Sequence, residues 1–172
     1  CDDPVVFMEH KDLWVLEGEV PDGPVAGDPI AELGRARIAR AGTDLTVVSW
    51  SAAVHGAMAA AETLGKEGIS AEVVDLRTIW PWDREAVLAS VRRTGRLLVV
   101  HEAVAAGGFG AEIAATVAET LHGDLRAPVR RLGAPRIPIS YAPPLEDRVR
   151  VTPEAIATAA RGMVGQPEAA NG

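Results

Sequence analysis

The sequence predicts an α/β protein with three layers: a mostly parallel five-stranded sheet with helices on both faces and one antiparallel edge strand. Strand-like and helix-like segments alternate between residues 35 and 163, which is typical of parallel sheets whose crossover connections are helices. Hydrophobic residues make up 48% of the chain but aromatic residues only 4%, so small aliphatic side chains dominate the predicted core. A chain of 172 residues suffices for one domain with a sizeable core.

Five aliphatic segments are predicted strands, at residues 35–40, 45–50, 71–76, 96–101 and 128–132. The first two flank Ala41–Asp44, which favours a β-hairpin in which Gly42 supplies a positive φ. We expect this hairpin to contribute the antiparallel strand.

Four helices are expected between and after these strands, over residues 53–67, 84–94, 110–121 and 153–163. Ser51, Asp83 and Thr152 stand where N-cap side chains are expected to accept the first free backbone N–H groups. Gly68 and Gly95 are placed to end the first two helices.

The chain is predicted to have four parts. Residues 1–14 contain the apolar segment Val5–Met8, which we expect to be the last strand of a preceding domain, because a lone strand needs a sheet to join. Residues 15–33, rich in Gly, Pro and Asp, are an expected linker, 34–165 the main domain, and 166–172 a frayed tail.

Charge and composition disfavour several classes of function. A formal net charge of −7 argues against a nucleic-acid binder, which needs a basic face. Apolar stretches fall short of the ~20 residues of a membrane-spanning helix. The one cysteine permits no internal disulfide and favours a reducing compartment.

The carboxyl end of the fourth predicted strand carries candidate chemistry. His101 could act as an acid or base there, but Glu102 should point to the opposite face of the sheet, so a structural His at a domain or subunit interface is the favoured interpretation. The glycine-rich turn Gly107–Gly110 opens a helix and could cradle a phosphate. Ile113 replaces the third glycine of a dinucleotide motif, which favours a tight structural turn instead.

Bulky aromatic residues and prolines in loops indicate contact surfaces. Trp80-Pro81-Trp82 and the expected extended arm from Tyr141 to Glu146 either anchor interfaces or pack within the domain. The interface candidates are Trp80, Pro81, Trp82, His101, Glu102, Phe109, Tyr141, Pro143 and Pro144.

Nine short motifs occur in order along the chain: Pro4–Lys11, Leu33–Arg37, Asp75–Thr78, Pro81–Asp83, Thr94–Arg96, His101–Ala103, Gly107–Gly110, Ala127–Pro128 and Tyr141–Glu146. As a set they resemble the carboxyl-terminal half of the β subunit of thiamine-diphosphate-dependent 2-oxo acid dehydrogenases. The resemblance implies that residues 1–14 end a pyrimidine-binding domain and that 34–165 form a transketolase-type C-terminal domain.

The resemblance also implies a function. Such β subunits work in α2β2 heterotetramers, which decarboxylate a 2-oxo acid on thiamine diphosphate with Mg²⁺ and pass the acyl group to a lipoyl-bearing acyltransferase core. The family's active-site histidine and its glutamate that contacts the cofactor precede this segment, so no catalytic or cofactor-binding residue is assigned here, and this chain alone is expected to be inactive. Some members bind a monovalent cation, K⁺, which would meet backbone oxygens of Cys1 and Asp3 here.

Further expectations follow from this resemblance. The segment would serve contacts with the α subunit, a second β subunit and the acyltransferase core, in the cytoplasm, or in the mitochondrial matrix of a eukaryote. Two alternatives remain open: a stand-alone assembly module of the same fold, and the last domain of a transketolase-like thiamine enzyme.

Overall fold

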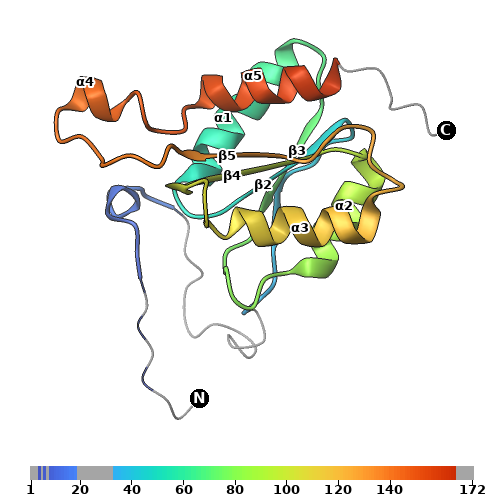
Figure 1. Ribbon diagram of the computed structural model, residues 1–172, viewed down its shortest axis with the longest axis horizontal. Coiled ribbons are helices and arrows are strands. Elements are labelled where there is room, and N and C mark those ends of the chain that lie inside the picture. Colours follow the sequence, from blue (N-terminus) through green and yellow to red (C-terminus); the bar gives the residue numbers. More distant parts are fainter. Residues whose placement is uncertain (1–3, 5, 7, 19–32, 166–172) are drawn as a thin grey trace.

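The computed structural model describes residues 4, 6, 8–18 and 33–165 and contains a five-stranded sheet (Figure 1). The strands lie in the order β1-β3-β2-β4-β5. Their bounds are β1 Arg37–Arg40, β2 Leu45–Ser49, β3 Ala71–Asp75, β4 Leu97–Val104 and β5 Arg130–Ala134. The β1–β3 pair is antiparallel and the other three pairs are parallel. The predicted mixed sheet with one antiparallel edge strand is confirmed.

Two pairs of helices cover the two faces of the sheet, which confirms the three layers (Figure 1). Helices α1 (Ala53–Lys66) and α5 (Pro153–Val164) lie over one face, and α2 (Arg84–Thr94) and α3 (Gly110–Leu121) over the other. Successive residues of a strand point to opposite faces. Val47 accordingly packs in the α1/α5 core and Val48 in the α2/α3 core.

The predicted hairpin of the first two strands is wrong. β1 pairs with β3 and not with β2, because β3 lies between them. Thr43 and Asp44 both donate backbone N–H groups to the carbonyl of Ser70, so the connection from β1 to β2 crosses the amino end of β3. Gly42 is not among the described glycines with positive φ. Glycine is needed here instead because the chain passes so close over β3 that a Cβ would collide with the β3 backbone.

The predicted helix caps are right at two positions and wrong at one. The side chains of Asp83 and Thr152 accept the backbone N–H groups of Ala86 and Ala155, as expected. Ser51 does not cap α1: the N-cap is Ala52, with no side-chain bond, and Ser51 has a φ of 55°. The N-cap is therefore one residue later than Ser51.

We expect Asp83→Ala to cost about 2 kcal/mol of the free energy of unfolding, because Asp83 makes two backbone hydrogen bonds. Its Oδ1 accepts Ala86 N at 3.0 Å and its Oδ2 accepts Ala36 N at 2.9 Å, joining α2 to the residues before β1. Thr152→Ala removes a single cap bond and should cost about 1 kcal/mol. Urea denaturation of both variants measures the difference, and equal losses would contradict a contribution from the bond to Ala36.

Two short helices lie outside the layers. One lies in the expected extended arm, and the other follows the expected strand Val5–Met8. The expected extended arm contains α4 (Pro143–Glu146), a single helical turn that buries no residue. Val6 and Met8 lie in no strand and are exposed, and they precede the 3₁₀ helix η1 (Lys11–Leu13). Val5 and Phe7, the expected linker residues 19–32 and the expected tail 166–172 lie outside the described residues.

Candidate functional site

His101 is buried inside the domain, on the face of β4 that α2 and α3 cover. Its ring stacks on that of Trp50, with centroids 5.2 Å apart and planes inclined by 19°. A Cβ added to Gly108, Gly110 or Gly133 would come within 2.6–2.8 Å of the ring. The imidazole therefore fills the space that these three glycines leave open.

This environment keeps the imidazole uncharged at neutral pH. Burial is the largest influence and lowers the pKa of His101; the backbone of Ala103 raises it by less, and the positive charge of Arg131 lowers it further. Within the described part of the chain, neither ring nitrogen is within hydrogen-bonding geometry of a partner. Within this chain His101 is thus a buried core residue.

The glycine-rich turn serves His101 and does not form a phosphate cradle. The backbone N–H groups of Ala111, Glu112 and Ile113 already donate to the carbonyls of Gly108 and Phe109, and the imidazole lies against Gly108 and Gly110. The preferred interpretation, a tight structural turn, agrees with this geometry. The amides of Ala111, Glu112 and Ile113 are therefore not free to bind a phosphate.

Metal ligands are not gathered in the part of the chain that the structure describes: no three His, Cys, Asp or Glu side chains there lie close enough to hold an ion. Cys1 and Asp3, the expected backbone ligands of a monovalent cation, lie outside the described residues. The described residues therefore offer no cluster of ligands for the Mg²⁺ of thiamine diphosphate. No helix in the described ranges is long and apolar enough to cross a membrane.

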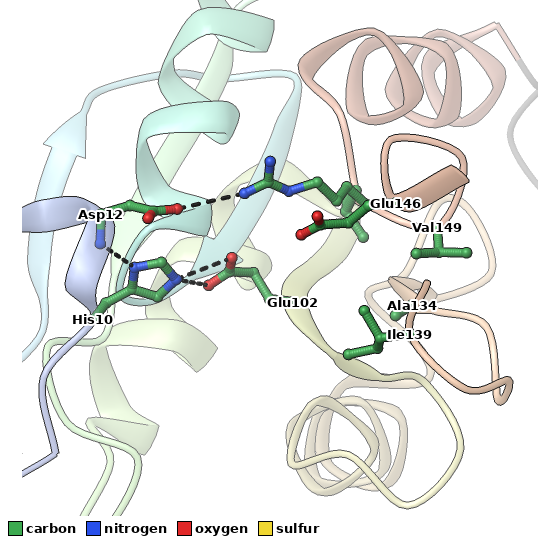
Figure 2. A pocket seen from close by; sticks show the side chains of 9 residues that line it. His10, Asp12, Glu102, Ala134, Ile139, Glu146 and Val149 are labelled. Atoms are coloured by element: carbon green, nitrogen blue, oxygen red, sulfur yellow. Dashed lines mark hydrogen bonds and ion pairs between the residues drawn. The ribbon is translucent and has the colours of Figure 1, made fainter. Parts of the chain in front are cut away.

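Glu102 lies on the opposite face from His101, as expected, and it is paired with His10 (Figure 2). Nε2 of His10 lies 3.2 Å from Oε1 and 3.1 Å from Oε2 of Glu102. Nδ1 accepts the backbone N–H of Asp12 at 3.2 Å and caps η1. Nε2 therefore donates to Glu102, and both ring nitrogens are engaged.

No local pattern in the sequence predicts the pairing of His10 with Glu102. The two residues are 92 positions apart, and the sequence places them in different domains. The pairing therefore follows only from their proximity in the folded chain.

A pocket of about 290 Å³ lies beside this pair, with a charged wall and an apolar wall (Figure 2). Its lining comprises His10, Asp12, Glu102, Ala134, Ile139, Glu146, Val149, Arg150 and Val151. A second pocket, of about 330 Å³, shares Asp12, Glu102, Arg150 and Val151 with it. Arg150 is paired with Asp12 at 3.4 Å. Carboxylates outnumber the one guanidinium, so the first pocket disfavours anionic ligands such as a diphosphate.

The aromatic candidates divide between core and surface. Trp82 and Phe109 pack against the α2/α3 core and against each other, with ring centroids 6.4 Å apart, which supports the core alternative for Trp82. Trp80 is 79% exposed and Tyr141 fully exposed. Pro81, Pro143, Pro144 and Glu102 are exposed as well.

Comparison with known proteins identifies the fold family. Residues 34–156 match the family described as "Transketolase, C-terminal domain". The chain belongs to this family. The transketolase C-terminal domain thus covers the sheet, helices α1 to α4 and the start of α5.

Two relatives extend the similarity beyond this domain. The chain is 46% identical to acetoin:2,6-dichlorophenolindophenol oxidoreductase subunit beta of Cupriavidus necator, over 92% of its own length. It is 43% identical to 2-oxoisovalerate dehydrogenase subunit beta of Bacillus subtilis, over 94% of its length. The chain spans only 46% and 49% of these two relatives.

Solved structures share the fold of the transketolase C-terminal domain. A split-gene transketolase, solved as an inactive beta4 tetramer, matches with a TM-score of 0.63 and 29% identity, over 76% of this chain and 41% of that chain. A transketolase mutant from Pichia stipitis matches with a TM-score of 0.52 and 18% identity, over 77% of this chain and 18% of that chain. The second likeness concerns the fold alone.

Proposed function

We propose that this chain is the carboxyl-terminal part of the β subunit of a thiamine-diphosphate-dependent 2-oxo acid dehydrogenase, in which it serves subunit assembly. The observation that carries the proposal is identity of 43–46% to such β subunits and their acetoin-type counterpart over more than nine-tenths of the chain. In this arrangement residues 1–14 end the pyrimidine-binding domain, 15–33 form the linker, 34–165 the C-terminal domain and 166–172 its tail.

Catalysis belongs to the complete heterotetramer in this proposal. Thiamine diphosphate with Mg²⁺ is held by the preceding part of the β subunit together with the α subunit, and it supplies the carbanion chemistry of decarboxylation. A K⁺ ion at the backbone of Cys1 and Asp3 would stabilise the preceding loop. The enzyme would act in the cytoplasm, or in the mitochondrial matrix in a eukaryote.

Exposed aromatic and apolar side chains support a role in assembly. Trp80 and Ile79 extend from the loop after β3, and Ile38 is exposed on the antiparallel edge strand β1. Tyr141 and Ile139 are exposed on the arm before α5. Large apolar side chains that remain exposed in an isolated domain are typical anchors of protein interfaces. We assign the exposed residues Ile38, Ile79 and Trp80, and those of the arm, Ile139 and Tyr141, to contacts with the α subunit, the second β subunit and the lipoyl-bearing acyltransferase core.

Replacement of the most prominent anchor should weaken assembly without unfolding the domain. We expect Trp80→Ser in the full-length β subunit to weaken heterotetramer formation by about 30-fold, or about 2 kcal/mol. Trp80→Phe keeps an aromatic anchor and should remain near wild type. Analytical ultracentrifugation of the two variants with the α subunit measures the effect, and unchanged association of Trp80→Ser would remove Trp80 from the interface.

The function itself is tested by isolating the native polypeptide with its partners. A mass near twice that of this chain, a copurifying second subunit and decarboxylation of a 2-oxo acid that depends on thiamine diphosphate are the expected results. Turnover by the 172-residue chain without an α subunit would contradict the proposal. So would a native polypeptide of this length that copurifies with no thiamine-enzyme partner.

A further inference from the structure

One hydrogen bond to a carboxylate and one ion pair attach the segment Met8–Gly18 to the domain. His10 pairs with Glu102 at the end of β4, and Asp12 pairs with Arg150 in the loop that leads to α5 (Figure 2). The paired residues are 92 and 138 positions apart in the sequence. The segment is therefore held at two points that belong to different parts of the fold.

The orientation of His10 is fixed from both sides of its ring. Nδ1 accepts the N–H of Asp12 within the segment, while Nε2 donates to Glu102 on the domain. The same residue that caps η1 thus makes the contact with β4. Because Asp12 is the next but one residue, the cap also places its carboxylate toward Arg150.

Little else holds this segment. Its helix η1 buries no residue, and Trp14, Val15 and Leu16 are all more than half exposed. Its remaining hydrogen bonds in the described residues are internal, such as Leu13 N to His10 O and Trp14 N to Lys11 O. None of its side chains belongs to either core cluster. The position of the segment therefore depends on the hydrogen bond from His10 to Glu102 and on the ion pair of Asp12 with Arg150.

We infer that Glu102 and Arg150 form a two-point electrostatic clasp that fixes the segment Met8–Gly18 against the C-terminal domain. The inference rests in part on the proposed function: in a full-length β subunit the clasped residues His10 and Asp12 belong to the end of the pyrimidine-binding domain. The clasp then sets the position of that catalytic domain relative to the C-terminal domain. Glu102 and Arg150 are positioning residues in this scheme and touch no substrate.

Exposed ion pairs add little to global stability and weaken in salt. Loss of the clasp should consequently loosen the segment without lowering the melting temperature of the domain. In the full-length β subunit assembled with its α subunit, we expect Glu102→Gln and Arg150→Gln each to speed amide hydrogen exchange at Leu13 and Trp14 about 5-fold, and the double variant more. Salt at 1 M should loosen the wild type and leave the double variant unchanged.

Matched controls separate the clasp from a general change of surface charge. Glu112→Gln on α3 and Arg148→Gln remove exposed charges for which the structure gives no ion pair, and both should leave exchange unchanged. Asp12→Arg should loosen the segment, and Asp12→Arg combined with Arg150→Asp should restore protection by reversing the pair. Unaltered exchange in the Glu102→Gln/Arg150→Gln variant, or no recovery on charge reversal, overturns the clasp.

Turnover of the full-length complex tests what the clasp positions. The mass of the assembled complex should be the same for the double variant as for the wild type. Its kcat for the 2-oxo acid should fall about 3-fold or more at unchanged KM, because the substrate binds to the pyrimidine-binding domain. Faster exchange with unchanged kcat overturns the positioning role. A wild-type complex without any 2-oxo acid turnover contradicts the proposed function, and the exchange measurements then still decide whether the clasp exists.

Discussion

Gly42→Ala is expected to destabilise the domain by about 3 kcal/mol or more, which lowers the melting temperature by roughly 6–12 °C. An added Cβ at this position would lie 2.2 Å from the backbone N of Glu72 and 2.3 Å from the backbone C of Ala71. Backbone atoms cannot rotate away as the end of a flexible side chain can. The amino end of β3 would have to move, and β3 pairs with both β1 and β2.

Gly56→Ala provides the matched control. Gly56 lies within α1, and its added Cβ would meet only Cδ1 of Ile156, at an ordinary contact distance of 3.6 Å. Alanine restricts the unfolded chain and favours the helix, so this change should stabilise by about 0.5–1 kcal/mol. Urea denaturation of both variants checks the opposite signs. A loss below about 1 kcal/mol for Gly42→Ala would mean that the crossing over β3 is looser than the structure has it.

Local sequence signals predicted the helices well, because the information lies within each element. Asp83 and Gly95 bound α2 as expected, with Gly95 in the left-handed conformation at a φ of 69°. The pairing of β1 could not be predicted in the same way. Hairpin chemistry around Gly42 is a local signal, whereas the insertion of β3 between β1 and β2 depends on residues about 30 positions later.

The candidate site shows the same limit at longer range. Sequence reasoning placed His101 and Glu102 on opposite faces, since side chains alternate along a strand. It did not reveal that Gly133, on β5, joins Gly108 and Gly110 around the imidazole. Each glycine taken alone is consistent with a turn or a bulge. Only the assembled sheet shows that one buried ring requires all three.

The buried imidazole leads to the second large effect: acid should destabilise the domain through His101. The native state disfavours the charged ring, so the folded pKa lies below the ordinary value near 6.5. As the pH falls below about 6.5, the unfolded chain binds a proton at His101 that the native state does not. The free energy of unfolding should then fall by up to about 1.4 kcal/mol per pH unit, until the folded pKa is reached. Above the unfolded pKa the group contributes no pH dependence.

Replacing His101 separates its part of the pH dependence of stability from the part that comes from the carboxylates. His101→Leu keeps a side chain of similar size and sacrifices no hydrogen bond, because neither ring nitrogen has a partner in the described residues. We expect it to flatten the decline in stability between pH 7 and pH 5, whereas His55→Gln, at an exposed position on α1, should retain the wild-type slope. Urea denaturation is measured at pH 5, 6 and 7 from the fluorescence of tryptophans such as Trp50, which stacks on His101. The midpoints give the pH dependence of stability for the wild type, His101→Leu and His55→Gln. If His101→Leu and the wild type lose stability equally, the acid sensitivity lies elsewhere and the native state accommodates a charged imidazole between Trp50 and the glycines.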